Sequence, residues 1–492
     1  MDRTPELLRR TAELAIDYLA GVDERPVGIP AQPAEVRRPL DVELTEGGED
    51  PLAVVESFAA AAEPGLVATA GPRYFGFVIG GSEPAAVAAD WLTSAWDQNA
   101  GLFVSSPAAA AVEDVVEGWI VDLLGLPAGT AVGFTTGATM ANFTALAAAR
   151  SEVLRRAGWD VEAHGLIGAP AIRIVVGGEV HATVPYALRL LGLGSETAIR
   201  VPADDQGRMP PDALREVLIG GPSGNGAAPS PTIVCAQAGN VNTGAFDPLE
   251  PIVAACREVG AWLHVDGAFG IWAAVSPALR GGLAGLEGAD SWTTDAHKWL
   301  NVPYDCGIVA VRDRLVLRRS MALSAAYLLR NEADGRDPYD YVPDASRRAR
   351  AFTVYAALRA LGPDGLRELI ERCSSHARRF ADELGREPGV QILNDVVLNQ
   401  VLVRFTHRGD ETAGGDDTAA GDARTRAVIA AVQRDGTCWV GGTTWHGVGA
   451  MRISVSNWRT TEADVGRSVE AILRCAREAG REPALAGPSP RV

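Results

Sequence analysis

Lys298 is the only lysine in this chain of 492 residues, and it lies in the segment DAHKWL at residues 295–300. Every other one of the 45 basic residues is an arginine, which serves a solvated surface about equally well, so a chance survivor is one explanation. Arginine cannot replace lysine where a neutral primary amine must attack a carbonyl and form a Schiff base, because guanidinium stays protonated and delocalised. The residues around Lys298 must decide between these explanations.

A carboxylate precedes this lysine in the segment LHVDGAFG, where Asp266 ends an apolar strand. In open α/β sheets, ligands bind beyond the carboxyl ends of the strands. A carboxylate at that place can keep a heteroaromatic nitrogen protonated, which a pyridine cofactor needs in order to act as an electron sink. An aspartate that caps the following turn would give the same pattern. Ala268 has no polar group but can lie flat against a ring face.

A phosphate site is indicated upstream, in GFTTGATMANFTALAAAR, where a Gly/Thr turn passes into an Ala-rich helix. Gly137, Ala138 and Thr139 stand at the junction, and a helix N-terminus offers free N–H groups and a favourable dipole to an anion. An ordinary N-cap would look similar. Two histidines are equally ambiguous: His181, in GGEVHATVPYALRLLGLG, can stack on a cofactor or cap a helix, and so can His297, beside the lysine.

Composition excludes several classes of function. Acidic residues outnumber basic ones, 62 to 45, and no Lys/Arg tract marks a nucleic-acid surface. The six cysteines are spread singly without a CxxC pair, which favours a reducing cytoplasm and speaks against a metal site. The N-terminal segment lacks a signal peptide's apolar region, and no apolar run of about 18 residues could span a membrane. We therefore expect a cytoplasmic protein without nucleic-acid or membrane partners.

The pattern of expected elements divides the chain into three parts that must position these residues. Residues 1–65 predict an N-terminal helical arm with a Pro-rich connection, RPVGIPAQPAEVRRPL. Residues 66–345 alternate Ala/Leu-rich helical stretches with buried strands such as AIRIVVGG, TIVCAQAG, WLHVDGA and CGIVAVR, which indicates a large α/β domain with a mostly parallel sheet. Residues 346–492 predict a smaller α+β domain, in which GDETAGGDDTAAGDAR and the tail EPALAGPSPRV are expected to be mobile surface segments.

Together these motifs resemble fold-type I pyridoxal-phosphate enzymes, and HKWL followed by DCG is similar to their group II amino-acid decarboxylases, the aromatic and glutamate decarboxylase family. The resemblance covers nearly the whole chain, including GPRYFGFV and MRISVSNWRTTEADV. It implies the aminotransferase-like fold, with pyridoxal 5'-phosphate as cofactor. Its implied site consists of the Schiff-base lysine Lys298, the pyridine-nitrogen partner Asp266, Ala268 beneath the ring, His181 stacked above it, and Gly137, Ala138, Thr139 and His297 at the phosphate.

The resemblance also implies the reaction, the decarboxylation of an L-amino acid to an amine and carbon dioxide. Tyr327 matches the loop tyrosine that protonates the product carbanion in the family, whereas relatives with phenylalanine there tend toward oxidative deamination. Arg452 does not discriminate decarboxylases from aminotransferases. The alternatives are therefore an aminotransferase, a carbon–carbon lyase or a catalytically silent scaffold of the same fold.

The sequence does not identify the substrate, and two departures from the family pattern limit how far the family's site residues can be carried over to this chain. Asp295 and Ala296 stand where aromatic decarboxylases usually have Asn-Pro, and we do not assign Asp295 as a phosphate ligand because a carboxylate repels phosphate. WDQNAGLFVSSP also differs from the aromatic enzymes. Trp96 and Phe103 are the candidate pocket residues, and with Trp445 they favour an aromatic substrate. We expect a homodimer, since the N-terminal arm needs a surface to embrace.

Overall fold

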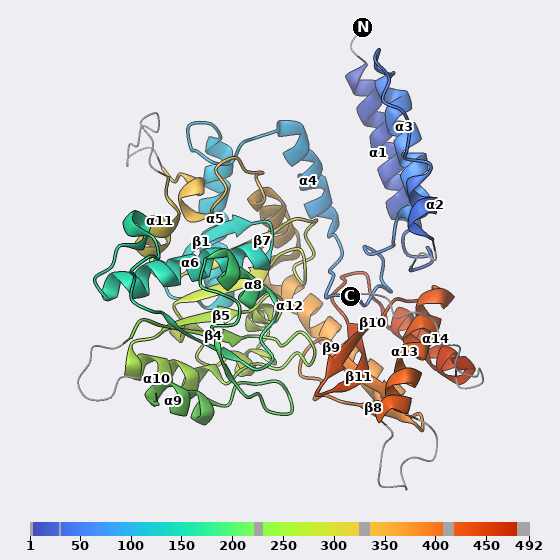
Figure 1. Cartoon of the computed structure of the whole chain (residues 1–492). Coiled ribbons are helices and arrows are strands. Elements are labelled where there is room, and N and C mark those ends of the chain that lie inside the picture. The colour runs from blue at the N-terminus through green and yellow to red at the C-terminus, as the bar shows by residue number, and fades with distance from the viewer. Residues whose placement is uncertain (1–2, 29–30, 221–229, 324–334, 407–417, 480–492) are drawn as a thin grey trace. The chain divides into compact units, whose positions relative to one another are not determined.

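The structure is a computed structural model that describes residues 3–28, 31–220, 230–323, 335–406 and 418–479 (Figure 1). The chain divides into two compact units. The larger unit comprises Gly80–Arg378 and Asn394–Val401, and the smaller unit comprises Met1–Ile79, Arg379–Leu393 and Leu402–Val492. The division predicted from the sequence, at residues 65 and 345, cuts the chain elsewhere and stays a prediction.

The larger unit is built on a seven-stranded sheet with the strand order β1-β7-β6-β5-β4-β2-β3. Its strands pair in parallel except β7, which is antiparallel to both β1 and β6. Because most of these strands are buried along their whole length, they appear in the sequence as continuous apolar or β-branched runs. The strands are β1 (Ala131–Thr135), β2 (Arg173–Gly177), β3 (Ile199–Val201), β4 (Thr232–Gln237), β5 (Trp262–Asp266), β6 (Ser291–Asp295) and β7 (Gly307–Val311). The predicted α/β class and mostly parallel sheet are confirmed.

Helices pack against this sheet (Figure 1). The long helix α6 is the most buried of them, and its alanines let it approach β5, β6 and β7 closely. The helices are α4 (Pro84–Trp96), α5 (Pro107–Leu124), α6 (Ala138–Arg156), α7 (Val161–His164), α8 (Thr183–Leu190), α9 (Pro211–Ile219), α10 (Leu249–Val259) and α11 (Arg314–Met321). Short 3-10 helices are η2 (Gly270–Val275), η3 (Arg280–Leu283), η4 (Leu286–Gly288) and η6 (Pro338–Tyr341).

The second sheet has four strands in the order β10-β11-β9-β8. They are β8 (Val390–Ile392), β9 (Gln400–Phe405), β10 (Gly441–Trp445) and β11 (Val448–Ser454), accompanied by α13 (Thr418–Asp435) and α14 (Glu462–Ala479). The long α12 (Ala351–Leu384) is broken at Gly362, where φ is 61°, so the two helices predicted there are its two halves. Trp445 packs with Leu402 and Ala450 in a buried cluster of this part of the chain.

One expected surface segment is partly wrong. Of GDETAGGDDTAAGDAR, the stretch 409–417 lies outside the described residues, but 418–424 forms the start of α13. Tertiary contacts override the Gly/Asp composition, because α13 packs on α14 and β11. Gly421 is required there: a Cβ would lie 2.5 Å from Nη2 of the buried Arg404, whose Nη1 also pairs with Asp422 at 2.6 Å. The expected mobile tail lies outside the described residues.

The N-terminal segment forms α1 (Thr4–Gly21), α2 (Pro33–Arg37) and α3 (Pro51–Ala62), followed by the short η1 (Glu63–Gly65). Helix α1 packs on α3, and none of the three helices contributes a buried residue. Charged pairs such as Arg3–Asp50 and Arg10–Glu56 link the two helices. The predicted helix at the N-terminus is therefore present, with large apolar side chains left exposed.

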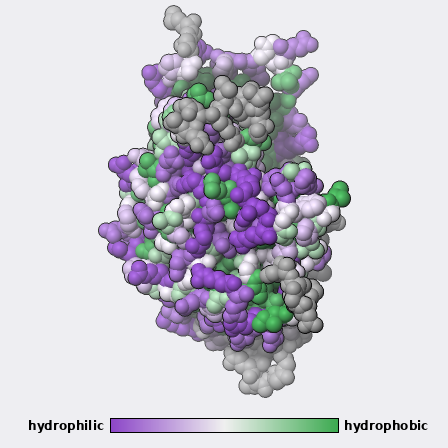
Figure 2. All heavy atoms as spheres, turned by 90° about the vertical axis from the view of Figure 1, so that its left-hand side faces the viewer, coloured by the Kyte–Doolittle hydropathy of each residue, from purple (hydrophilic) through white to green (hydrophobic). Residues whose placement is uncertain are grey.

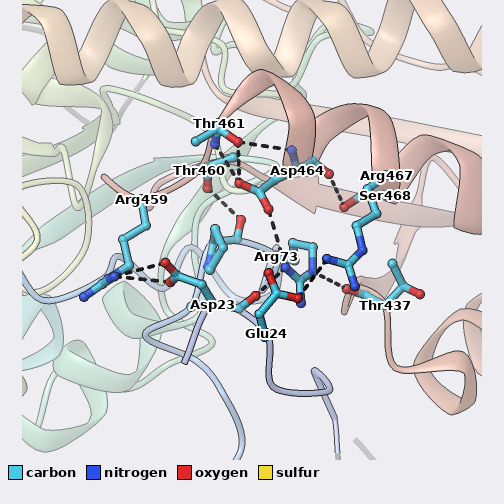
Figure 3. A network of polar contacts seen from close by, with 12 residues as sticks. Asp23, Glu24, Arg73, Thr437, Arg459, Thr460, Thr461, Asp464, Arg467 and Ser468 are labelled. Carbon is cyan, nitrogen blue, oxygen red and sulfur yellow. Dashed lines mark hydrogen bonds and ion pairs between the residues drawn. The ribbon is translucent and has the colours of Figure 1, made fainter. Parts of the chain in front are cut away.

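Arg73 ties the early part of the smaller unit to its C-terminal part (Figure 3). Its guanidinium donates to the backbone oxygens of Thr437 (2.7 Å) and Asp23 (2.6 Å) and lies 3.5 Å from the Asp464 carboxylate. Asp464 in turn exchanges hydrogen bonds with Thr461 in a capping box at the start of α14. Because Arg73 is only 2 % exposed, these contacts satisfy a charge that burial would otherwise make costly.

The surface drawn in Figure 2 is mainly hydrophilic, with apolar residues in small separate groups. Within the described parts of the chain, no helix is both long enough and apolar enough to cross a membrane. The same residues contain no cluster of three or more His, Cys, Asp or Glu side chains that could hold a metal ion. All six cysteines are free and buried.

Candidate active site

The polar residues singled out in the sequence gather at the carboxyl edge of the larger sheet. Asp266 ends β5 and Asp295 ends the neighbouring parallel strand β6. Lys298 follows Asp295 within one turn, and His181 follows β2. Gly137 follows β1 and is the N-cap of α6, which lies beside β5 and β6. Parallel strands bring their carboxyl ends to one edge, and this explains the gathering.

Lys298 is held by an ion pair with Asp295, with Nζ and Oδ2 2.9 Å apart. The other carboxylate oxygen of Asp295 accepts the backbone N–H of Ala138 at 2.6 Å. The Asp295 side chain is 3 % exposed, whereas the Lys298 side chain is 19 % exposed and keeps an open side. Sequence reasoning set Asp295 aside, yet this residue joins Lys298 to the N-terminus of α6. Its position three residues before the lysine is the feature of the sequence that could have indicated this pairing.

Asp266 is buried and accepts two hydrogen bonds through different oxygens. The backbone N–H of Ala268 donates to Oδ1 and the Asn142 side-chain amide donates to Oδ2, both at 3.1 Å. Asn142 lies on α6 and is fully buried. Sequence reasoning missed Asn142, although a polar residue in the Ala-rich helix one turn after the Gly/Thr junction was a usable signal.

His181 is connected to Asp266 through two intermediates. Its Nδ1 lies 2.8 Å from the Thr183 hydroxyl and also accepts the backbone N–H of Thr183 at 3.3 Å. The Thr183 hydroxyl oxygen accepts from the Asn142 amide at 3.2 Å, so one amide group contacts both Thr183 and Asp266. The half-buried His181 ring is therefore oriented by the same residue that contacts the Asp266 carboxylate.

The N-terminus of α6 offers donors to an anion. Gly137 makes no side-chain cap, and within the described residues the N–H groups of Thr139 and Met140 have no protein acceptor. Gly307 lies so close that a Cβ on it would be 2.4 Å from the Cα of Gly137. A Cβ on Gly137 would itself lie 3.2 Å from Cε1 of His297. This backbone therefore leaves a cradle that side chains would fill.

His297 borders this cradle and is neutral near pH 7. Its Nδ1 accepts the backbone N–H of Cys306 at 3.1 Å, so the proton of the neutral ring is on Nε2, 3.5 Å from Asp295 Oδ1. Burial lowers the pKa of His297, and the nearby Asp295 carboxylate offsets only part of that effect. The ring also stacks on Tyr304, with centroids 4.3 Å apart.

Other predicted residues are not joined to this group. Tyr327 lies outside the described residues. Trp96 is 53 % exposed and packs edge to face on Phe352, while Phe103 donates its backbone N–H to Asp337. These contacts connect neither aromatic residue to Lys298 or Asp266.

Trp445 is buried in the cluster with Leu402 and Ala450, and this core position does not support a role in a substrate pocket. Arg452, for which the sequence leaves two readings open, lies on β11 in the smaller unit.

The donor set fits pyridoxal phosphate. A buried carboxylate can face a protonated ring nitrogen, a lone primary amine can attack the aldehyde, and free helix amides beside a side-chain-free cradle can take the phosphate. The Asp295 carboxylate opposes an anion there, and the Lys298 ammonium offsets its charge. A fold-type I α/β sheet with this edge defines a pyridoxal-phosphate enzyme.

Comparison with known proteins defines the family. The chain belongs to the pyridoxal-dependent decarboxylases, because the model of the pyridoxal-dependent decarboxylase conserved domain matches residues 33–406. The human acidic amino acid decarboxylase GADL1 is 30% identical over 73% of this chain and 68% of the relative. An aromatic-L-amino-acid decarboxylase of Bacillus atrophaeus is 26% identical over 80% of each chain.

Solved structures share the fold. A crystal structure of Oryza sativa TDC with PLP and tryptamine has a TM-score of 0.89 at 24% identity, covering 97% of this chain and 98% of the other. Mouse CSAD has a TM-score of 0.87 at 24% identity and covers 96% of this chain and 98% of its own. The predicted family, fold, cofactor and enzyme class are confirmed: this chain is a pyridoxal-phosphate-dependent amino-acid carboxy-lyase.

Proposed function

We propose that this enzyme decarboxylates an L-amino acid with an aromatic side chain, using Lys298 and Asp266 as its central groups. The observation that carries the proposal is their meeting at one edge of the sheet, with Lys298 paired to Asp295 and Asp266 held by Asn142. The family assignment supports decarboxylation over the aminotransferase, carbon–carbon lyase and silent-scaffold alternatives.

The side chains of this site have distinct roles. When bound, pyridoxal phosphate supplies an aldehyde that reacts with amines and a protonated ring that accepts the electron pair left when carbon dioxide departs. Lys298 supplies the protein's amine, and Asp295 holds that amine at the edge of the sheet. The Asp266 carboxylate would keep the ring nitrogen protonated by accepting a hydrogen bond from its N–H group. The backbone amides of Thr139 and Met140 would hold the phosphate, beside Gly137 and Ala138, and His297 would border it.

Two further residues face the ring in this proposal. By sequence resemblance, His181, whose ring is oriented by Thr183, would stack on one face, and Ala268 would lie against the other. By sequence resemblance, Tyr327 protonates the carbanion that decarboxylation leaves. A phenylacetaldehyde synthase from a Rosa hybrid cultivar is 28% identical to this chain, so the choice between amine and aldehyde products must be measured.

We favour an aromatic substrate over an acidic one, and three arginines in the described segment 347–350 already have carboxylate partners. Arg347 pairs with Glu113 at 2.5 Å, Arg348 with Asp90 at 2.7 Å and Arg350 with Asp305 at 2.9 Å. An acidic side chain would need a cation of its own to offset the loss of hydration on binding. Trp96 and Phe103 are proposed to contribute apolar surface to the pocket.

The enzyme is proposed to act as a homodimer in the cytoplasm. Helices α1 and α3 bury no residue and expose Leu8 (59%), Ile16 (57%) and Phe58 (63%), while α4 exposes Trp91 and Leu92. Apolar groups of this kind on several helices are typical of a surface covered by a second copy. Sedimentation velocity should give a dimer, and Phe58→Glu with Leu8→Glu should shift it toward monomer. A fully active wild-type monomer would contradict the assignment.

A substrate panel tests the reaction. Purified enzyme with pyridoxal phosphate is given aromatic, acidic and basic L-amino acids, and both carbon dioxide and the organic product are measured. Carbon dioxide with the matching amine from an aromatic amino acid is expected. Release from glutamate or aspartate analogues alone would replace the proposed substrate class, and no carbon dioxide from any amino acid would refute the proposed function.

A further inference from the structure

A line of buried hydrogen bonds runs from the amino end of β5 and β6 to the Asp266 carboxylate. Trp262 Nε1 donates to Ser291 Oγ at 2.9 Å, and Ser291 Oγ lies 2.9 Å from His264 Nδ1. His264 Nε2 lies 2.9 Å from Asn142 Oδ1, and Asn142 Nδ2 donates to Asp266 at 3.1 Å. The relay therefore consists of Trp262, Ser291, His264 and Asn142, from β5, β6 and α6.

Chemistry gives this relay one direction. The Asn142 nitrogen donates to Asp266, so its oxygen faces His264 and must accept, which places the His264 proton on Nε2. His264 Nδ1 then accepts from the Ser291 hydroxyl. Ser291 is free to donate because its oxygen accepts from the Trp262 indole, which can only donate. Each group thus donates toward Asp266.

The relay is neutral and closed to solvent. Asn142, His264 and Ser291 are 0 % exposed and Trp262 is 2 % exposed. Burial lowers the pKa of His264 to about 4, so the ring carries no charge at neutral pH. Asp266 is the acceptor at the end of the line, and a hydrogen bond donated in a buried place is electrostatically stronger than one made in water.

We propose that Asn142 is a positioning residue for the reaction and that His264 locks the Asn142 amide so that the Asp266 carboxylate stays aimed at the pyridine nitrogen. The inference rests on the proposed role of Asp266. It extends that role from one carboxylate to the buried residues behind it. The competing explanation is that the relay only joins β5, β6 and α6 within the core.

Binding of two cofactor forms to the apoenzyme separates these explanations. The probes are pyridoxal phosphate and its 1-deaza analogue, in which a C–H group replaces the ring nitrogen, and the readout is the ratio of their dissociation constants. Wild type should prefer pyridoxal phosphate. Asn142→Ala should lower this preference roughly tenfold to hundredfold, the effect of one hydrogen bond to a charged group, through weaker binding of pyridoxal phosphate alone.

Two variants at His264 are compared in the same binding experiment. The amide of His264→Gln can still donate to Asn142 and should keep most of the preference, whereas His264→Leu should lose it. Ser291→Ala removes only a hydroxyl and should also lower the preference. It is the variant to use if the larger changes prevent folding. Asn394→Ala is the control, because that buried amide contacts the backbone of Thr243 and Gln400 instead.

The possible outcomes distinguish a role of Asp266, a role of the relay and a role in packing alone. If the wild-type apoenzyme does not prefer pyridoxal phosphate over the 1-deaza analogue, the proposed contact between Asp266 and the ring nitrogen is refuted. A wild type with the preference, together with Asn142, His264 and Ser291 variants that keep it, would overturn the relay while leaving Asp266 in place. Equal weakening of both ligands in these variants would likewise show that the relay acts only through packing.

Discussion

Replacing Asp295 with asparagine tests how the reactive amine is held. The change keeps the size of the side chain but removes the charge that faces Lys298 Nζ at 2.9 Å. Removing one partner of a buried ion pair typically costs 3–5 kcal/mol. Since the Lys298 side chain is 19 % exposed and water can partly replace the carboxylate, we expect a loss near the lower end, about 3 kcal/mol.

Urea unfolding of the apoenzyme, followed by tryptophan fluorescence, measures this loss. The control is Asp90→Asn, which breaks the pair with Arg348, where both side chains are about one third exposed, at 37% and 27%, so less than about 1 kcal/mol is expected. A variant as stable as wild type would refute the reasoning.

The remaining predictions concern four residues. Borohydride reduction should fix pyridoxal phosphate on the peptide containing Lys298 in wild type and leave no such adduct in Lys298→Arg, as mass spectrometry can check; an absent wild-type adduct would withdraw the assignment. Asp266→Ala should keep covalent attachment but slow turnover by several orders of magnitude, and near-normal turnover would contradict its role. Tyr327→Phe should release aldehyde and hydrogen peroxide in air, whereas unchanged amine output would remove Tyr327 from the mechanism. Burial lowers the pKa of His264 to about 4 in the folded protein, against 6.5 in the unfolded chain, so the unfolded chain binds more protons between these two pH values. The free energy of unfolding should therefore fall as the pH drops from 6.5 to 4, by up to about 3 kcal/mol. His264→Gln should flatten this dependence of the unfolding free energy on pH, and an unchanged dependence would show that His264 is not its cause.

Much of the larger sheet could be predicted from local pattern. The runs that became β2, β4, β5 and β7 are short, β-branched and bounded by glycine, because strands buried on both faces have no polar side to show. What the pattern did not show is that β7 runs antiparallel between β1 and β6. Strand order depends on crossovers and pairing between distant segments, which periodicity does not encode.

The C-terminal part shows the limit of composition. The stretch 418–424 has few apolar residues and was expected to be a surface segment, yet it starts α13. Arg404 explains this outcome, since its buried guanidinium pairs with Asp422 and donates to the backbone oxygen of Thr418. An arginine in a strand gives no sign in the sequence that it will donate a hydrogen bond to the start of a helix fourteen residues away.

The sequence by itself determined the chemistry of the site. A single lysine, an aspartate at the end of a buried strand and a glycine turn before a helix identify a cofactor and a reactive amine, because these roles require particular functional groups. Only the tertiary structure decided which residues hold those groups in place. Asp295 pairs with Lys298, and Asn142 and His264 line up behind Asp266. Their roles depend on distances between β5, β6 and α6, which form only when those elements pack, and no local spacing specifies such distances.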